Sequence, residues 1–261
     1  MHNSMLLGGG SQAVVFTQNG LTAVKIFRPR ALCSATSALA QQEFLFAQRW
    51  LAHPNIVRVF ELDLTNGSLA MEYVDGGSLA DILDREGALA ERCIVPVLAG
   101  IIAGLSRMHE HNVLHRDVKP SNVLIDMRTG ASKLTDWIGL GAETASLLLG
   151  KPVGTPVFMA PEVAGKPHTH KVVSDTWSLG CTVVNMASGQ LPWADTDAHG
   201  RTNEFTAMWL TAEGKAPPFD ASRWSPELAA FVALCFEPDP CRRPCAQDLH
   251  KHGLMCAITH I

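Results

Sequence analysis

The alternation of apolar and polar residues predicts short strands in the first third of the chain. Two apolar-rich runs, Ala13 to Thr17 and Thr22 to Phe27, flank the tripeptide Gln18-Asn19-Gly20. Asn-Gly between two such runs is a strong short-range signal for a hairpin turn. We therefore expect a β-hairpin here.

A helix and two further strands are expected after the hairpin. Ser34 or Thr36 is a suitable N-cap for the helix. The helical pattern runs to about Ala52, where His53-Pro54-Asn55 stops it. The two strands are predicted at Ile56 to Leu62 and at Ser68 to Tyr73.

Beyond Asp75-Gly76-Gly77-Ser78 the pattern becomes helical. Cys93 to Glu110 is apolar but too short to span a membrane, so it predicts a buried helix. A later helix is apolar on all sides, which also predicts burial. Its apolar residues are Trp177, Leu179, Cys181, Val183, Val184 and Met186. Strands followed by helices indicate the α+β class.

Composition narrows the function classes. The 261 residues are 47% hydrophobic, and 21 Lys and Arg against 25 Asp and Glu give a net charge of −4, too weak to attract nucleic acid. The first ten residues lack the features of a signal peptide, and no window approaches 18 uninterrupted apolar residues. We expect a soluble cytoplasmic protein with no nucleic-acid or membrane partner. The seven cysteines are irregularly spaced, which favours reduced thiols over disulfides or a zinc site.

One carboxylate interrupts the apolar stripe of the first helix. Glu43 lies in register with Leu39, Phe46 and Trp50. It is either a residue at the edge of the stripe that reaches water or a buried carboxylate that needs a partner. Lys25, inside an apolar strand, needs a counter-charge for the same reason and is the candidate partner.

Glycines near the start form a candidate phosphate-binding turn. Leu7 to Val15 is glycine-rich and lies between two strands, and backbone N–H groups without nearby Cβ atoms approach phosphate oxygens closely. Alone, such a run is more often an ordinary turn. Lys25 follows on the next strand, where it could reach the α- and β-phosphates of a nucleotide.

The most specific chemical signal is the octet His115 to Asn122. Asp117 can accept a proton from a substrate hydroxyl, and Lys119 can neutralise a transferring phosphoryl group. The amide oxygen of Asn122 can bind Mg²⁺, and Asp136 supplies a second carboxylate for a metal that bridges β- and γ-phosphates.

These motifs resemble, in type, order and spacing, those of the eukaryotic protein kinase family, from Leu7 to about Leu254. The further matching segments are Met71 to Val74 (gatekeeper and hinge), Gly154 to Pro156 with Met159 to Glu162 (substrate-binding end of the activation segment), Ser174 to Gly180 (start of the central helix), and Arg243, which pairs in the family with the glutamate matching Glu162.

The resemblance implies a two-lobed kinase fold, with residues 1–74 as the small lobe and 75–261 as the large lobe of one domain. It implies ATP and Mg²⁺ as cofactors, Asp117 and Lys119 as catalytic residues, and Asn122 and Asp136 as metal ligands. The implied nucleotide-binding residues are Leu7, Gly8, Gly9, Gly10, Ser11, Gln12, Ala13, Val14, Val15, Ala23, Lys25, Glu43, Met71, Glu72, Val74 and Leu124. Glu43 is the implied partner of Lys25, and Asp175 is implied to anchor the catalytic-loop backbone.

The expected activity is phosphorylation of serine or threonine in protein substrates of a signalling cascade. The serine/threonine pattern of the family is followed at Lys119 to Asn122 and at Thr155. The sequences of residues 71–79, 154–163 and 174–193 look most like those of the mitogen-activated protein kinase kinase kinase group. A kinase for small molecules is less well supported, because the segment Gly154 to Val163 resembles a peptide-binding element.

Three departures from the family support an alternative, a pseudokinase that acts as a nucleotide-binding or scaffolding module. Ala13 replaces a loop glycine, Trp137-Ile138 alters the segment after Asp136, and Lys151 occupies the usual phosphate-acceptor position. Thr144 and Ser146 are the remaining candidates for regulatory phosphorylation, against the reading that they are unregulated surface hydroxyls.

Overall fold

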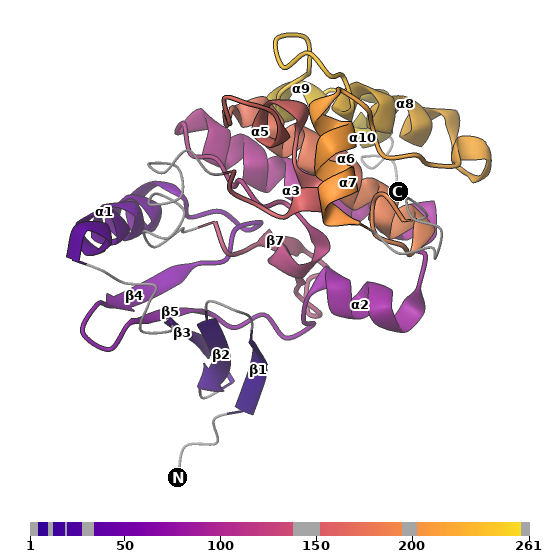
Figure 1. Ribbon diagram of the computed structural model, residues 1–261. Coiled ribbons are helices and arrows are strands. Elements are labelled where there is room, and N and C mark those ends of the chain that lie inside the picture. Colours follow the sequence, from indigo (N-terminus) through magenta and orange to yellow (C-terminus); the bar gives the residue numbers. More distant parts are fainter. Residues whose placement is uncertain are drawn as a thin grey trace.

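The computed structural model describes residues 5–9, 13–18, 20–27, 34–137, 152–194 and 203–256. The first part of the chain forms a five-stranded antiparallel sheet in the order β1-β2-β3-β5-β4, with helix α1 beside it (Figure 1). The bounds are β1 Met5–Gly9, β2 Ala13–Gln18, β3 Thr22–Phe27, α1 Ser34–Trp50, β4 Val59–Asp63 and β5 Ser68–Glu72.

The predicted hairpin is confirmed. Strands β2 and β3 pair from Ala13 opposite Phe27 to Gln18 opposite Thr22, and Gly20 in the turn has φ of +66°. A positive φ favours glycine, which explains why the Asn-Gly signal is informative here. The predicted helix is confirmed as well, since α1 begins at Ser34 and ends at Trp50, two residues before the predicted end.

The strand predicted from Ile56 begins later, at Val59. The backbone of residues 55–57 binds a strand of the helical part instead: Leu134 N–H donates to Asn55 O at 2.9 Å, and Val57 N–H donates to Leu134 O at 2.9 Å. These bonds use the polar groups that a longer β4 would need. The loop after α1 is therefore tied to the opposite half of the molecule.

The remainder is mainly helical and forms the upper part of Figure 1. Its long helices are α2 Leu79–Glu86, α3 Glu91–Glu110, α6 Val172–Ser188, α7 Glu204–Ala212 and α8 Pro226–Cys235. Its short elements are η1 Pro120–Asn122, β6 Val123–Ile125, β7 Ser132–Leu134, η2 Pro156–Phe158, α5 Pro161–Ala164, η3 Ala221–Arg223, α9 Ala246–Leu249 and α10 Gly253–Cys256. This arrangement confirms the α+β class, and we propose residue 75 as the boundary between the two lobes.

The local sequence explains where several of these helices begin and end. Ser78 and Asp81 form a reciprocal capping box at the start of α2. Ser225 caps α8, whose first residue is Pro226. Helix α6 ends at Ser188, and Gly189 after it adopts the left-handed conformation with φ of +71°.

Helices α3 and α6 form the core of the large lobe. All residues of α6 from Val173 to Met186 are buried, which confirms the prediction from its all-round apolar surface. Helix α3 is 20 residues long and, by length and composition alone, is apolar enough to cross a membrane, so the expectation that this stretch is too short to do so is wrong. It packs against α6, α9 and β7, as a core helix does. Gly104 of α3 allows the loop after α1 to approach, because a Cβ there would lie 2.8 Å from Asn55 O.

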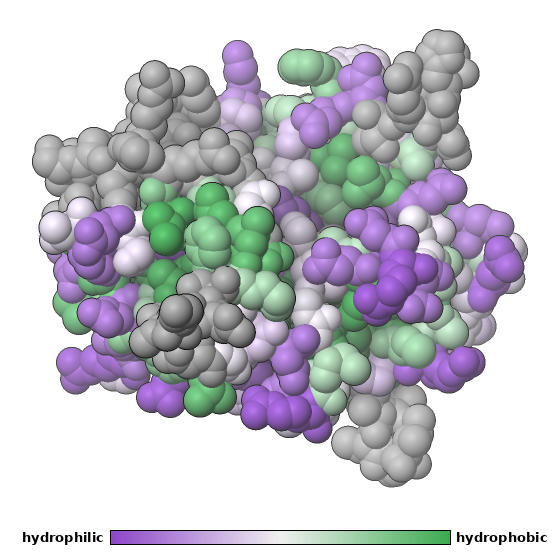
Figure 2. All heavy atoms as spheres, turned by 90° about the horizontal axis from the view of Figure 1, so that it is seen from below, coloured by the Kyte–Doolittle hydropathy of each residue, from purple (hydrophilic) through white to green (hydrophobic). Residues whose placement is uncertain are grey.

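The sheet leaves apolar side chains on the surface. Figure 2 views the molecule from below the sheet of Figure 1 and shows apolar residues gathered on this face. Leu6, Ile26 and Phe60 are among the exposed apolar side chains of β1, β3 and β4.

Candidate active site

The predicted catalytic loop lies between α3 and β6 and is held by a buried carboxylate of α6. Asp175 Oδ2 accepts a hydrogen bond from His115 N–H at 2.9 Å, and Oδ1 accepts one from Arg116 N–H at 2.8 Å. His109 Nε2 lies 2.8 Å from Asp175 Oδ2. The predicted contact between Asp175 and the loop backbone is confirmed.

Electrostatics favour the ionised form of Asp175. Burial alone would raise the pKa of this carboxyl, but the hydrogen bond with His109 and the backbone donor of His115 outweigh it and hold the pKa below its ordinary value. The backbone of Arg116 has φ of +69°, in the left-handed region, and its bond to Asp175 stabilises this conformation. The protein's own hydrogen bonds therefore hold the backbone of this loop without any ligand.

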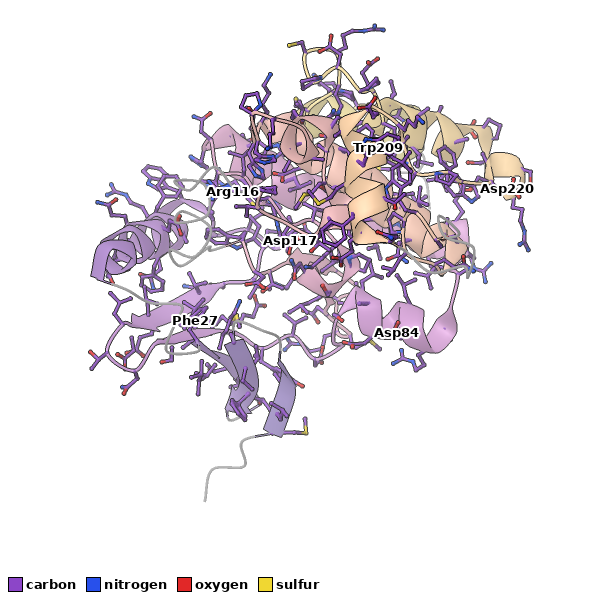
Figure 3. The ribbon with its side chains drawn as sticks, in the orientation of Figure 1. Phe27, Asp84, Arg116, Asp117, Trp209 and Asp220 are labelled. Atoms are coloured by element: carbon purple, nitrogen blue, oxygen red, sulfur yellow. The ribbon has the colours of Figure 1, made fainter. Side chains whose placement is uncertain are left out.

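Asp117 stands at the centre of a cluster of polar side chains (Figure 3). Thr155 Oγ1 donates to Asp117 Oδ1 at 2.7 Å, and Lys119 Nζ lies 2.6 Å from Asp117 Oδ2. Lys119 Nζ also donates to Thr155 Oγ1 at 2.5 Å. Asn122 Nδ2 donates to the Asp117 carbonyl at 2.8 Å and to its Oδ2 at 3.1 Å. The carboxylate is therefore oriented by an ammonium, a hydroxyl and an amide at once.

The predicted ion pair between Lys25 and Glu43 is wrong for this structure. Lys25 Nζ pairs instead with Asp136 Oδ1, on the segment that follows β7. The backbone of Asp136 has φ of +64°, in the left-handed region, and in this conformation its carboxylate contacts the Lys25 ammonium. Glu43 and Asp136 are both candidate partners for the Lys25 ammonium, and in this structure Asp136 is the one that pairs with it.

Glu43 is left without that partner. Its Oε2 atom is buried and has no hydrogen-bond partner among the described residues. Burial raises the pKa of Glu43, and the positive charge of Arg116 offsets only part of this effect. The sequence argument that Glu43 needs a compensating charge was sound, but the structure does not supply one from Lys25.

The strand register places part of the predicted nucleotide site on one face of the sheet. Val15 lies opposite Lys25, and Ala23 precedes Lys25 by two residues, so their side chains share the face of Lys25. Val14 lies on the opposite face, which leaves only its backbone for a ligand. Of the other predicted residues, Leu7, Gly8 and Gly9 lie in β1, Ala13 in β2, Met71 and Glu72 in β5, Val74 just after β5, and Leu124 in β6.

The Glu72 side chain in the predicted hinge is already occupied. Its Oε1 lies 2.8 Å from Lys133 Nζ, and its Oε2 accepts a hydrogen bond from Arg58 N–H at 3.2 Å. Lys133 is buried on β7, three residues before Asp136. Because the Glu72 carboxylate is already paired, this segment can hydrogen-bond the adenine ring of a nucleotide only through its backbone.

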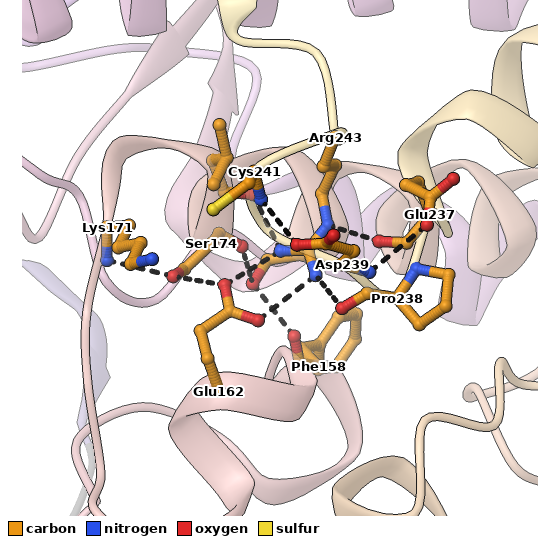
Figure 4. A network of polar contacts seen from close by, with 11 residues as sticks. Phe158, Glu162, Lys171, Ser174, Glu237, Pro238, Asp239, Cys241 and Arg243 are labelled. Carbon is orange, nitrogen blue, oxygen red and sulfur yellow. Dashed lines mark hydrogen bonds and ion pairs between the residues drawn. The ribbon is translucent and has the colours of Figure 1, made fainter.

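The segment predicted to bind the substrate is anchored by a buried ion pair (Figure 4). Arg243 Nη1 and Nη2 donate to the two oxygens of Glu162 at 2.8 and 3.0 Å. Ser174 Oγ donates to Glu162 Oε1 at 2.7 Å. Burial would raise the pKa of Glu162, but hydrogen bonds from Arg243 and Ser174 hold it below its ordinary value. The predicted pairing is confirmed.

Several predicted functional residues lie outside the described residues. They are Gly10, Ser11 and Gln12 of the glycine-rich loop, Ile138 and Gly139 after Trp137, and the three activation-segment positions Thr144, Ser146 and Lys151. Trp137 itself is described, and its side chain is buried in the core. Thr144 and Ser146 remain predictions as phosphorylation sites.

Two polar residues of the site were missed from the sequence. His109 binds Asp175 from the apolar helix α3, and Lys133 binds Glu72 from the short strand β7. Both had a detectable signal, because a charged or titratable residue inside an apolar element needs a partner. The same argument singles out Lys25 and Glu43.

Comparison with known proteins identifies the class. Residues 1–255 match the family model "Protein kinase domain", so the chain belongs to the protein kinase family. The resemblance inferred from the motifs and the expected two-lobed kinase fold are thereby confirmed.

Relatives in the mitogen-activated protein kinase cascade are similar over most of the chain. It is 38% identical over 208 residues to mitogen-activated protein kinase kinase kinase A of Dictyostelium discoideum, covering 78% of this chain and 21% of that protein. It is 33% identical over 261 residues to mitogen-activated protein kinase kinase 2 of Arabidopsis thaliana, covering 96% of this chain and 70% of that protein. A mouse relative, mitogen-activated protein kinase kinase kinase 1, is 33% identical over 210 residues, and the match covers 77% of this chain and 14% of that protein.

Proposed function

We propose that this chain transfers the γ-phosphoryl group of ATP to serine or threonine hydroxyls of protein substrates in a phosphorylation cascade. The observation that carries the proposal is the cluster in which Asp117 is oriented by Lys119, Thr155 and Asn122. A carboxylate fixed in this way can receive a proton, and an ammonium beside it can stabilise negative charge on a transferring phosphoryl group. Phosphoryl transfer asks mainly for placement and charge stabilisation.

In the proposed reaction the substrate oxygen forms a bond to the γ-phosphorus as the bond from that phosphorus to the β,γ-bridging oxygen breaks. The hydroxyl proton passes to a carboxylate oxygen of Asp117. Lys119 Nζ, 2.6 Å from Asp117 Oδ2, balances the charge that develops on the transferring group. Thr155 limits the position of the incoming hydroxyl, because its own hydroxyl already bonds both groups.

The side chains proposed as metal ligands fit Mg²⁺ by their chemistry. Mg²⁺ prefers oxygen ligands, commonly one or two carboxylates with phosphate oxygens and water. Asn122 uses its amide nitrogen to bind Asp117, so its amide oxygen is the atom suited to a metal. Asp136 supplies a carboxylate that is 44% exposed. When bound there, Mg²⁺ would neutralise charge on the β- and γ-phosphates.

The proposed nucleotide site lies between the sheet and β6. Val15 and Ala23 would cover the adenine ring from the sheet side and Leu124 from the other, with hydrogen bonds from the backbone of Glu72 to Val74. Lys25 would bind the α- and β-phosphates. For this it must leave Asp136, which becomes available to the metal at the same time.

The cascade assignment rests on the relatives, which are named as kinases of mitogen-activated protein kinase kinases or of mitogen-activated protein kinases. We propose that the substrate is a kinase of such a cascade and that the protein is cytoplasmic. The chain spans about a fifth of the length of the Dictyostelium relative. The pseudokinase alternative is less favoured, since Lys25, Asp117, Asn122 and Asp136 are all present.

The test measures transfer of labelled phosphate from the γ-position of Mg-ATP to the protein itself and to a generic acceptor protein. Asp117→Asn removes the proposed proton acceptor, and Asp84→Asn is a matched control because Asp84 is an exposed carboxylate on α2 (Figure 3). Label incorporated by the wild type and by Asp84→Asn, but lost in Asp117→Asn, supports the proposal. Absence of label from the wild type, with Mg-ATP still raising the melting temperature, would support the pseudokinase alternative.

A further inference from the structure

Helix α7 carries two aromatic side chains that the fold leaves exposed. Phe205 is 87% exposed and Trp209 is 61% exposed, and they lie one helical turn apart at positions i and i+4. Phe205 is the most exposed of the large apolar side chains that the structure describes. Two such rings present roughly a few hundred Å² of apolar surface, the size at which an exposed patch indicates a binding site. We call Phe205 and Trp209 the aromatic patch.

The inner side of α7 is apolar as well. Ala207 and Thr211 are buried there, and Leu210 packs against the core. A helix that is apolar on all sides is normally covered on all sides. Helix α6 follows this rule, since all its residues from Val173 to Met186 are buried, whereas α7 leaves its outer side in water. The outer side of α7 therefore suits a partner molecule better than it suits solvent.

Helix α7 lies against the segment predicted to bind the substrate. It packs on η2 and on α5. The first residue of η2 directly follows Thr155, whose hydroxyl donates to Asp117 at 2.7 Å. Three extended residues span at most about 10 Å, so the part of η2 that α7 covers is close to the proposed proton acceptor. Figure 3 shows Trp209 and Asp117 in the same lobe. A folded protein that brings a hydroxyl to Asp117 is therefore placed to cover α7 as well.

Charged groups of both signs surround the aromatic patch. Glu204 and Glu213 are exposed at the two ends of α7. Lys215 Nζ lies 5.8 Å from the centroid of the Trp209 ring. An apolar, aromatic centre with a polar rim is the usual composition of a protein–protein interface. A helix that binds a membrane surface instead carries mainly Lys and Arg on its polar side. The rim therefore favours a protein partner over a lipid surface.

We propose that the aromatic patch docks the folded protein substrate next to the site at which its hydroxyl is phosphorylated. The proposal rests on the proposed function, because it takes the substrate to be a kinase of the cascade. The substrate covers Phe205 and Trp209 with an apolar surface of its own while its acceptor segment lies along η2. Docking adds affinity outside the acceptor segment, so it makes transfer selective for the folded protein over a short peptide of the same sequence.

The test compares transfer to a folded acceptor with transfer to a peptide. The folded acceptor is a mitogen-activated protein kinase kinase made inactive by substitution. The peptide holds about nine residues centred on the labelled hydroxyl, which reach roughly 14 Å to either side. Phe205→Ala combined with Trp209→Ala should lower kcat/KM for the folded acceptor about tenfold or more, through a higher KM. The same variant should phosphorylate the peptide within about twofold of the wild type.

The matched control is Leu234→Ala. Leu234 is 43% exposed on α8, which packs on α6 and α10, and its loss should leave transfer to both acceptors unchanged. Equal losses for the folded acceptor and the peptide in the double variant would overturn the proposal, and so would an unchanged kcat/KM for the folded acceptor. Phe205→Ala alone, at the more exposed position, replaces the double variant if thermal unfolding shows that the latter is not folded at the assay temperature.

Binding separates failure of this proposal from failure of the proposed function. Titration calorimetry measures the affinity of the inactive kinase kinase for the wild type and for the double variant without any phosphate transfer. A wild type that transfers phosphate but binds this acceptor no more tightly than the double variant does overturns only the docking role. A wild type that transfers no phosphate, yet binds the acceptor about tenfold more tightly than the variant, overturns the proposed function and supports docking.

A second copy of this chain is the other occupant that the test must recognise. Size-exclusion chromatography with light scattering measures the oligomeric state of the wild type and of the double variant. A wild-type dimer that becomes a monomer when Phe205 and Trp209 are replaced would show that the patch binds another copy, and it would overturn the proposal. A monomer in both cases supports it.

Discussion

The buried ion pair between Glu162 and Arg243 gives the sharpest stability prediction. The Arg243 side chain is fully buried, and its Nη1 and Nη2 atoms donate to the two Glu162 oxygens at 2.8 and 3.0 Å. In Glu162→Gln one carboxylate oxygen is replaced by an amide NH₂ group. This group cannot accept the hydrogen bond that Arg243 Nη2 donates in the wild type. The guanidinium keeps its bonds to the carbonyls of Val173 and Glu237, at 3.0 and 2.8 Å, so it is not fully deprived of acceptors.

We expect Glu162→Gln to lower the free energy of unfolding by about 3 kcal/mol, the lower end of the range for removing one partner of a buried pair. For a chain of this size that corresponds to a fall in melting temperature of about 6 to 12 °C. The protein should remain folded at 25 °C, since total stabilities are typically about 5 to 15 kcal/mol. Chemical and thermal denaturation measure the change.

The control is Glu86→Gln, which removes an ion pair of similar distance at the surface. Arg85 Nε lies 3.0 Å from Glu86 Oε1, and both side chains are more than half exposed. Surface pairs contribute about 0 to 1 kcal/mol, so little change is expected. If Glu162→Gln costs no more than Glu86→Gln, the reasoning about the buried pair is refuted.

The pH dependence of the same pair has a definite sign. The folded-state pKa of Glu162 lies below its ordinary value of 4.5, so the folded protein binds this proton less tightly than the unfolded chain does. The stabilisation is complete above pH 4.5 and is lost as the pH falls through the folded-state pKa. The difference in stability between wild type and Glu162→Gln should therefore shrink on acidification, as denaturation curves at pH 7 and at pH 3 to 4 would show.

Three further predictions concern single residues near the site. Gly154→Ala should lower stability by about 1 to 3 kcal/mol in thermal unfolding and reduce phosphate transfer, because φ is +113° and a Cβ would lie 2.7 Å from Arg116 O. Thr155→Ala should reduce the rate of transfer about ten- to a hundredfold by removing the hydroxyl between Asp117 and Lys119, whereas Thr155→Ser should retain most of it; equal losses would contradict this role. Glu43→Gln should not lower the free energy of unfolding at pH 7, because burial raises the pKa of this carboxyl and its Oε2 has no hydrogen-bond partner among the described residues. Any advantage over the wild type should disappear at low pH, where the carboxyl is protonated, and a clear loss of stability at pH 7 would contradict this reasoning.

Local chemistry explains which parts of the fold were predictable from the sequence. The β2–β3 hairpin depends on Gly20, the start of α2 on Ser78, and the burial of α6 on its own apolar residues. Each signal acts within a few residues, so a reader of the sequence has all of the information. The predicted start of β4 was too early because the backbone of Asn55 and Val57 hydrogen-bonds to Leu134, which is far away in the sequence.

The site was predictable as a set of residues but not as a set of pairs. Asp117, Lys119 and Asn122 lie in one loop, and their contacts follow from its short length. The partner of Lys25 depends on which of two carboxylates, on different lobes, lies closer to it. Nothing near Lys25 in the sequence ranks Glu43 against Asp136, because this choice is set by how α1 and the segment after β7 are placed on the core.

The pairing of Lys25 with Asp136 also bears on how the proposed nucleotide site forms. The two side chains that would bind phosphate and metal are each other's counter-ions in the free protein, so the largely buried Lys25 ammonium is not left unpaired. Phosphate without a metal would release Lys25 but leave the Asp136 carboxylate unpaired, and a metal without phosphate would leave the Lys25 ammonium unpaired. Binding of both together conserves the charge balance, which favours the metal–nucleotide complex over either component alone.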